Sequence, residues 1–289
     1  MTDDTDAAAA GWFAGIEAGD TEALDRAIRT SSTTEPADWP RLAVKYEFVD
    51  SEDEYYSRLQ EATIQSTRRE ARAREQADDK QLLHAVRAMD DADRTANELA
   101  ERLSEWAGTL FDETGTGVDG ARKLATRSAE TPLEAQVISL AERVDELAGE
   151  GESLRQFINR QAPIVAPNLT EMAGPVLAAR LIALAGGLEQ LAKKPSGTVQ
   201  VLGAEDALFA HLAGRGSSPK HGIIYTHEYV SGTRPEDRGS AARAFAGKLS
   251  IAARIDHYSG ERKPEIHDEI KSRMSTIRAR AETDEVETQ

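Results

Sequence analysis

Apolar residues recur along this chain mostly at the spacing of an α-helix. From Leu82 onward they follow one another at alternating steps of three and four for four heptads, a pattern typical of coiled-coil packing. The same alternation returns from Leu133, after a Gly-rich segment at 112–120. Two apolar seams joined by a turn predict an antiparallel helical hairpin over residues 51–160, with a break near Asp78-Asp79.

The Gly-rich segment 112–120 matches the motif G-x-G-x-x-G through Gly115, Gly117 and Gly120. A dinucleotide-binding loop of this form needs a buried strand before it, whereas here a helical pattern precedes it. We therefore expect a turn between helices and no nucleotide site. In the second seam, Gly151 interrupts one apolar position.

The first fifty residues predict a small mixed element. Trp12, Phe13 and Ile16 have the spacing of a short helix face. The segment 42–49 (LAVKYEFV) alternates apolar and polar positions as a strand does, and prolines interrupt the stretch between these two elements.

The later part of the chain predicts a compact set of shorter helices. Pro163 and Pro167 mark its start, where Asn168 is expected to be an N-cap with Glu171 three residues on. Further helices are predicted at 172–193 with a break near Gly186-Gly187, at 204–213, at 240–258 and after Pro264, with one short extended run at 198–202. The expected buried faces are Ala241, Ala242, Phe245, Leu249, Ala252 and Ala253 in one helix and Ile266, Ile270, Met274 and Ile277 in the last.

Composition agrees with long, thin helices. Aromatic residues make up 5% of the chain and the mean hydropathy is −0.52, both low for a compact globule. Residues 1–160 hold 19 basic and 35 acidic side chains, a net charge of −16, whereas residues 161–263 have a net charge of +3. Scarce lysine with surplus acid is typical of salt-adapted proteins, in which repulsion from an acidic surface is screened within about 3 Å at molar salt.

The chain contains no cysteine, so disulfides and thiol chemistry are excluded and a reducing compartment is expected. No apolar run approaches the roughly 20 residues that span a bilayer. The start, MTDDTDAAAAGW, is acidic where a signal peptide would be basic. We expect a soluble cytoplasmic protein.

No pattern indicates an enzyme, a cofactor or a metal site. His221 and His227 have no carboxylate or third ligand at a recognised zinc spacing. The chain has neither a P-loop nor a G-x-S-x-G motif. Its acidic pairs lie on charged helix faces, where solvated surface is the ordinary interpretation.

Basic residues gather in the segment 193–254, around a short Gly/Ser loop at 214–218. Such a loop can bring backbone amides close to phosphates, and the lysines and arginines around it supply charge. RNA binding through phosphate contact and shape is one interpretation. Composition alone favours the other interpretation, in which these are ordinary ion-paired surface residues.

Four segments of this half resemble the Nop domain family. They are IVAPNLT at 164–170, GPVLAARLIALAGGLEQLAKKPSGTVQVLGAEDALFAHL at 174–212, SPKHGIIYTHEYV at 218–230 and RGSAARAFAGKLSIAARID at 238–256. Residues 87–108, RAMDDADRTANELAERLSEWAG, resemble the first coiled-coil helix of the same family. The resemblance covers about residues 50–282, and within the family the chain looks like the archaeal core protein of box C/D small RNA–protein complexes.

The resemblance implies an all-α protein whose coiled coil forms a homodimer and whose Nop domain binds a kink-turn RNA. In this family the RNA is a box C/D guide RNA, read jointly with a small kink-turn-binding, ribosomal-protein-like protein. It also implies docking of a fibrillarin-type methyltransferase, which methylates ribose 2′-hydroxyls, so the chain itself is a scaffold. We expect a shortened N-terminal docking region at 1–50, a coiled-coil hairpin at 51–160, a Nop domain at 161–282 and an acidic tail at 283–289.

Site residues follow from the matching motifs. The expected RNA contacts are Gly203, Ala204, Glu205, Arg215, Lys220, His221, Gly222, Arg238, Arg243 and Lys248. The expected dimer contacts of the coil are Leu99, Leu103, Trp106, Val137, Leu140 and Val144.

Three departures from the family pattern keep other functions open. Asp206 stands where a basic residue is usual, Arg215 is the only cation of the loop before PKHG, and the region 1–50 is short for methyltransferase docking. A coiled-coil adaptor that binds only proteins is one alternative. A divergent paralogue, folded but without RNA function, is the other.

Overall fold

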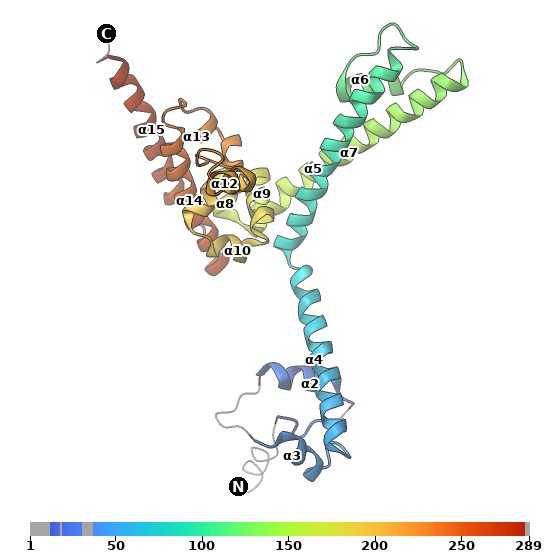
Figure 1. Ribbon diagram of the computed structural model, residues 1–289, viewed down its shortest axis with the longest axis vertical. Helices are drawn as coiled ribbons and strands as arrows, with labels where there is room; N and C mark the ends of the chain where they lie inside the picture. Colours follow the sequence, from blue (N-terminus) through green and yellow to red (C-terminus); the bar gives the residue numbers. More distant parts are fainter. Residues whose placement is uncertain (1–11, 18, 31–36, 287–289) are drawn as a thin grey trace. The chain divides into compact units, whose positions relative to one another are not determined.

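The structure is a computed structural model that describes residues 12–17, 19–30 and 37–286. It divides into two compact units, Met1–Ala77 and Asp78–Gln289. The described part is helical and contains no strand (Figure 1). The first unit has α2 (Thr21–Thr30), α3 (Trp39–Lys45) and α4 (Glu52–Glu75). The second has α5 (Asp78–Ala107), α6 (Gly117–Ala125), α7 (Pro132–Val165), α8 (Pro167–Ala173), α9 (Pro175–Ala185), α10 (Leu188–Lys193), α11 (Ser196–Val201), α12 (Glu205–Leu212), the 3₁₀ helix η1 (Ile223–Thr226), α13 (Glu228–Ser231), α14 (Arg238–Tyr258) and α15 (Glu265–Val286).

An aromatic cluster forms the core of the first unit. The rings of Phe13 and Phe48 stack at 4.9 Å, and the Trp12 indole donates a hydrogen bond of 3.1 Å to the Tyr55 hydroxyl. Asp25 on α2 is buried and accepts hydrogen bonds from two arginines, one of them Arg69 on α4 at 2.9 Å. Side chains from the start of the chain therefore join α2 and α4 into one small body.

The strand predicted at 42–49 is wrong, because α3 occupies Trp39–Lys45. Pro40 lies in the first turn of this helix, where its fixed φ is favourable and its missing N–H is not needed. After the end of this helix, Phe48 N donates a hydrogen bond of 2.9 Å to Ala43 O, and Glu47 has a left-handed conformation at φ 57°. Residues 12–15, expected to be helical, form a turn.

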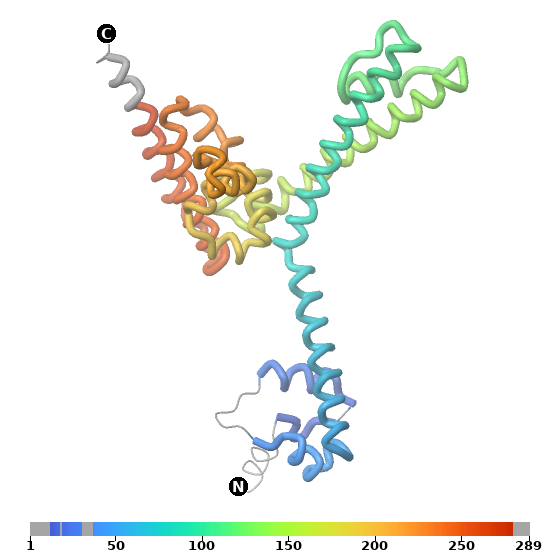
Figure 2. The backbone as a smooth tube through the Cα atoms, viewed as in Figure 1, coloured from blue at the N-terminus to red at the C-terminus, as the bar shows by residue number. Residues whose placement is uncertain are grey.

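Of the hairpin predicted over residues 51–160, α5 and α7 pack together with α6 at the tip (Figures 1 and 2), whereas Glu52–Glu75 forms α4 of the first unit. The predicted apolar positions are buried from Leu82 as far as Ala96. Beyond Ala96, Leu103 is buried as predicted, but two buried positions shift by one residue, from Leu99 to Ala100 and from Trp106 to Ala107. The shift arises because a straight helix has 3.6 residues per turn and drifts away from a strict 3.5-residue repeat.

Two glycines of the hairpin mark close approaches. The plain turn expected at 112–120 contains the start of α6, and a Cβ on Gly120 would lie 2.7 Å from the Gly115 carbonyl carbon. The seam pattern predicted an interruption at Gly151, but the packing continues there. Gly151 is buried beside Asp93, whose carboxylate pairs with Arg155 at 2.7 Å across the hairpin.

Helices α8–α11 and α13–α15, together with parts of α5 and α7, form one core around α14. Every residue of the faces predicted for α14 and α15 is buried. The predicted break at Gly186-Gly187 separates α9 from α10. The extended run predicted at 198–202 is wrong, since Ser196–Val201 forms the helix α11. A five-residue apolar run fits a helix turn as well as a strand, and here packing against α14 decides.

Two helices run across limits expected from the sequence. The helix α7 is continuous through residue 160 to Val165, and α15 reaches Val286, inside the expected acidic tail. The four-part division of the chain stays a prediction. Within the part that the structure describes, no helix combines the length and the apolar character needed to cross a membrane.

Asn168 is not the N-cap that the sequence predicted, because α8 begins at Pro167. The cap comes instead from Asp256 of α14, whose carboxylate accepts hydrogen bonds from Asn168 N at 3.0 Å and Leu169 N at 2.8 Å. The Asn168 amide oxygen then accepts a hydrogen bond of 2.6 Å from Lys263 N. Burial raises the pKa of Asp256, although these N–H donors act to lower it.

We expect Asp256→Asn to destabilise the second unit by about 1–3 kcal/mol, because an amide provides one acceptor where two buried backbone N–H groups need partners. Urea denaturation followed by circular dichroism measures the loss. Asp268→Asn, a change on the exposed side of α15, is the matched control. Equal stability of the two variants would show that the carboxylate does not hold α8.

Candidate RNA interface

The PKHG element at 219–222 is fixed to α11 by backbone contacts. Gly222 N donates to Gln200 O at 2.8 Å, and Ile223 N donates to Leu202 O at 2.7 Å. The Gln200 side-chain amide donates to Lys220 O at 2.7 Å. A Cβ on Gly222 would lie 2.0 Å from the Leu202 carbonyl oxygen, so only glycine fits there.

The GAE turn at 203–205 lies against the same element. Gly203 has φ +81°, and a Cβ there would lie 3.3 Å from the Ile223 Cβ. The Glu205 carboxylate accepts a hydrogen bond of 2.8 Å from Gly203 N, which fixes the entry to α12. The structure therefore brings together four of the expected RNA contacts, Gly203, Ala204, Glu205 and Gly222. That these residues contact RNA stays a prediction.

The helix α12 has no buried residue, although five of its eight residues are apolar. Phe209 is 64% exposed and Leu212 is 72% exposed. An exposed apolar patch next to charged elements is typical of a surface that meets a protein partner. The sequence alone did not indicate this surface, because a short apolar helix is ordinarily assigned to the core.

Lys220, His221 and Arg238 meet at the start of α14. The aliphatic stem of Lys220 passes Gly239, in the first turn of that helix, and Lys220 is exposed. Arg238 donates from Nε to Thr233 O at 3.0 Å, so part of its donor capacity is used inside the protein. Lys220 is therefore turned to solvent, whereas Arg238 is partly bonded within the protein.

The remaining predicted cations do not join this cluster. Arg215 is exposed in the loop after α12, and Arg243 is exposed on α14. Arg243 follows Arg238 by five residues, which places it about 140° further round the helix. Lys248 forms an ion pair with Glu269 of α15, so its charge is already compensated.

Two histidines near the element favour their neutral forms. Burial lowers the pKa of His221, and the charges of Arg238 and Lys220 lower it further. Burial also lowers the pKa of His227, whose Nδ1 accepts a hydrogen bond of 3.1 Å from Tyr229 N. His227 therefore caps the helix α13, where it is needed as an acceptor.

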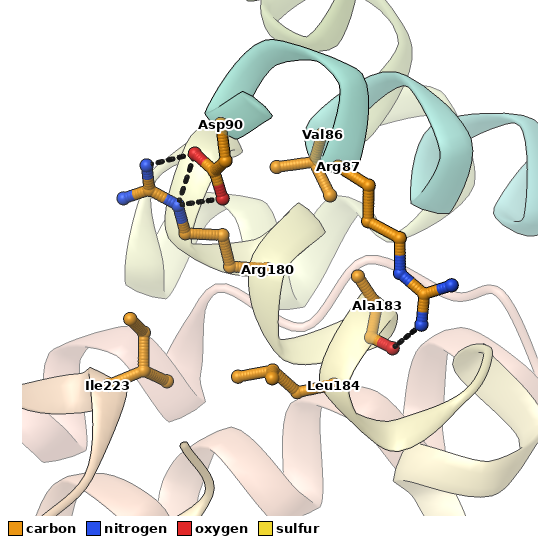
Figure 3. A pocket seen from close by; sticks show the side chains of 7 residues that line it. All are labelled: Val86, Arg87, Asp90, Arg180, Ala183, Leu184 and Ile223. Carbon is orange, nitrogen blue, oxygen red and sulfur yellow. Dashed lines mark hydrogen bonds and ion pairs between the residues drawn. The ribbon is translucent and has the colours of Figure 1, made fainter. Parts of the chain in front are cut away.

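A pocket of about 430 Å³ lies between α5, α9 and η1, behind the GAE turn (Figure 3). Val86, Leu184 and Ile223 form apolar walls, whereas the two arginines of the lining point in different directions (Figure 3). Arg180 donates from Nε to Asp90 at 3.1 Å, and Arg87 donates to Ala183 O at 3.4 Å. These pairs attach the hairpin to the helical core.

The predicted dimer residues divide into two groups. Leu103, Val137 and Val144 are buried between α5, α6 and α7 of the same chain. Leu99 and Leu140 are partly buried, and Trp106 is 40% exposed. The role of all six in dimer contact stays a prediction.

A comparison with protein-family models matches residues 122–277 to Nop, described as the snoRNA binding domain, fibrillarin. An uncharacterized NOP5 family protein of Methanocaldococcus jannaschii is 34% identical over 268 residues, which cover 80% of this chain and 65% of that protein. Nucleolar protein 56 of Saccharomyces cerevisiae is 32% identical over 229 residues, 64% of this chain and 45% of that protein. The chain thus spans less than two thirds of the length of these relatives.

The chain belongs to the Nop family, since the family model matches more than half of it. Its structure is similar to a chain of the crystal structure titled fibrillarin/Nop5p complex, with a TM-score of 0.53 and 24% sequence identity over 89% of this chain and 91% of that one. At this identity the likeness concerns the fold, and it agrees with the all-α class predicted from the sequence.

We expect Gly222→Ala to separate the PKHG element from α11, because the new methyl group collides with a backbone carbonyl that cannot move aside cheaply. Hydrogen exchange of the amides of Gly222 and Ile223 should accelerate by more than about tenfold, the change that corresponds to 1.4 kcal/mol of local opening. Gly216→Ala, in the neighbouring loop with open space around it, is the control. Unchanged exchange in Gly222→Ala would contradict the close approach.

Proposed function

We propose that the chain is an RNA-binding scaffold of the box C/D guide RNA–protein complex. In this proposal it reads a kink-turn RNA jointly with a small kink-turn-binding protein and organises 2′-O-methylation by a fibrillarin-type enzyme. Membership of the Nop family supports this proposal, as does the character of the relatives, which are NOP5 and nucleolar proteins. The observation that carries it is the rigid PKHG element with Lys220 exposed beside the first turn of α14.

This geometry suits a phosphate group. The N-terminal end of the 21-residue helix α14 carries partial positive charge, and the stem of Lys220 passes its first turn beside Gly239. Arg238 N, the first N–H of this helix, donates to Arg234 O at 3.1 Å. The N-cap residue Asp237 is held by an ion pair with Arg234 and does not cap α14 with its own side chain. The positive end of α14 and the charge of Lys220 therefore both favour an anion at the same place.

The exposed apolar side of α12 supports a protein partner next to the RNA. Phe209 and Leu212 offer apolar area, and the GAE turn connects this helix directly to the PKHG element. A composite site of RNA and protein uses both surfaces at once. A scaffold role, without catalysis by the chain itself, fits the family, and docking of the methyltransferase through the first unit is part of the proposal.

A gel shift on a box C/D kink-turn RNA over a salt series tests the RNA site. We expect binding that requires the small kink-turn protein, and we expect Lys220→Gln to weaken it about five- to tenfold while reducing the salt slope by about 1. Lys271→Gln is the matched control, because that lysine is exposed on α15 and is not among the expected RNA contacts. No shift under any salt condition would favour the adaptor that binds only proteins.

We further propose that the hairpin pairs two copies of the chain. Trp106 at the end of α5 and Leu133 at the start of α7 are 40% and 47% exposed, and both lie at the tip end of the hairpin. The residues buried within the hairpin hold the arm together, so these exposed ones are the candidates for contact between copies.

We expect Trp106→Ser to raise the dimer dissociation constant about tenfold or more, because the indole loses roughly 2 kcal/mol of burial in the dimer. Light scattering over a concentration series measures the mass, and circular dichroism checks that the hairpin stays helical. Tyr258→Ser, which removes an exposed ring from α14, should leave the mass unchanged. A dimer mass retained by the Trp106 variant at all concentrations would exclude this face.

A further inference from the structure

Tyr225 lies in the segment SPKHGIIYTHEYV at 218–230 but is not one of the expected RNA contacts. Its ring stacks on that of His221 with centroids 4.6 Å apart and planes 20° from parallel. The guanidinium carbon of Arg238 lies 5.4 Å from the centroid of the same Tyr225 ring. Tyr225 is 38% exposed, so this group of three side chains is not part of the hydrophobic core.

The backbone holds both rings in place. Tyr225 N donates to Gly222 O at 3.0 Å within η1, and Gly222 is fixed to α11 through Gln200. Arg238 donates to Thr233 O, and also to Ser231 O at 3.5 Å, so its side chain cannot swing away freely. Because the rings are ordered before any ligand arrives, binding to them costs little conformational entropy.

The chemistry of the group favours a base over a phosphate. The lowered pKa of His221 keeps its ring neutral at pH 7. Arg238 donates hydrogen bonds to backbone carbonyls, so Lys220 is the adjacent side chain that is suited to a phosphate. Flat, partly exposed, neutral rings stack on the faces of unpaired bases, the form in which RNA is most often recognised.

We propose that His221 and Tyr225 form a stacking platform for an unpaired base of the bound RNA, with Arg238 as the positioning residue that holds the Tyr225 ring. Lys220, next in the chain to His221, then meets the phosphate that flanks this base. The inference rests on the proposed RNA-binding function and adds the kind of nucleotide feature that the PKHG element recognises. Stacking accepts any base, so the platform selects an unpaired nucleotide and not a particular sequence.

The test combines protein variants with abasic RNA. Binding of wild type, Tyr225→Leu and His221→Ala is measured on the kink-turn RNA with the small kink-turn protein present. The same measurement is repeated on RNAs in which one unpaired nucleotide at a time lacks its base. Tyr258→Leu, at the far end of α14, is the control for loss of an exposed aromatic ring.

We expect Tyr225→Leu and His221→Ala each to weaken binding of the intact RNA about tenfold. At one position, removal of the base should weaken the wild type by a similar factor and abolish the difference between wild type and both variants. A variant that only disturbs the fold would lose the same factor on every RNA. His221→Ala keeps the proposal testable if Tyr225→Leu does not fold, because it leaves η1 unchanged.

The outcomes separate this inference from the function on which it rests. If wild type binds and Lys220→Gln weakens binding, but both ring variants bind as wild type, the platform is refuted and the RNA-binding function stands. The platform is also refuted if the variants weaken every abasic RNA equally. If wild type does not bind the RNA at any salt concentration, the proposed function itself fails.

Discussion

The candidate site depends on one close backbone contact, between residues 200–202 and residues 222–223. Residues 200–202 end α11, and Gly222 and Ile223 return to them with two N–H···O hydrogen bonds. No side chain fits between the segments at Gly222, so the contact excludes water and fixes both chain directions. The position of Lys220 beside α14, the stack of His221 on Tyr225 and the turn into α12 all depend on this one contact.

Charge is used in two different ways around that contact. Some cations are locked into the fold: Arg254 donates to Ala192 O at 3.1 Å at the end of α10, and Arg238 braces the turn before α14. Others, such as Lys220 and Arg243, face solvent. The chain has a net charge of −16, and only some cations of its net-positive segment are available to a ligand. They can be identified only once the cations bonded within the fold are set apart. Counting basic residues along the sequence cannot separate these two groups.

Long elements were more predictable than short ones. The periodicity over 82–96 and 240–258 extends over several turns, so only a helix fits it, and the buried faces of α14 and α15 are those predicted. The segments 42–49 and 198–202 are short enough to fit a strand or a helix, and both are helical because of Pro40 and of packing on α14. The cap of α8 could not be found locally, because its acceptor Asp256 lies 88 residues away from Asn168.

The sequence by itself determined the helical class, the hairpin and the family, because these follow from repeated spacings and from motifs such as GAE and PKHG. Its GAE and PKHG motifs also pointed to residues that lie against one another in the structure. Only the tertiary structure decided how those residues act: Lys248 is paired with Glu269, Arg238 is turned inward, and Tyr225 is placed under His221. The physical reason is that exposure, pairing and ring geometry depend on neighbours far apart in the chain, and spacing along one chain carries no information about them.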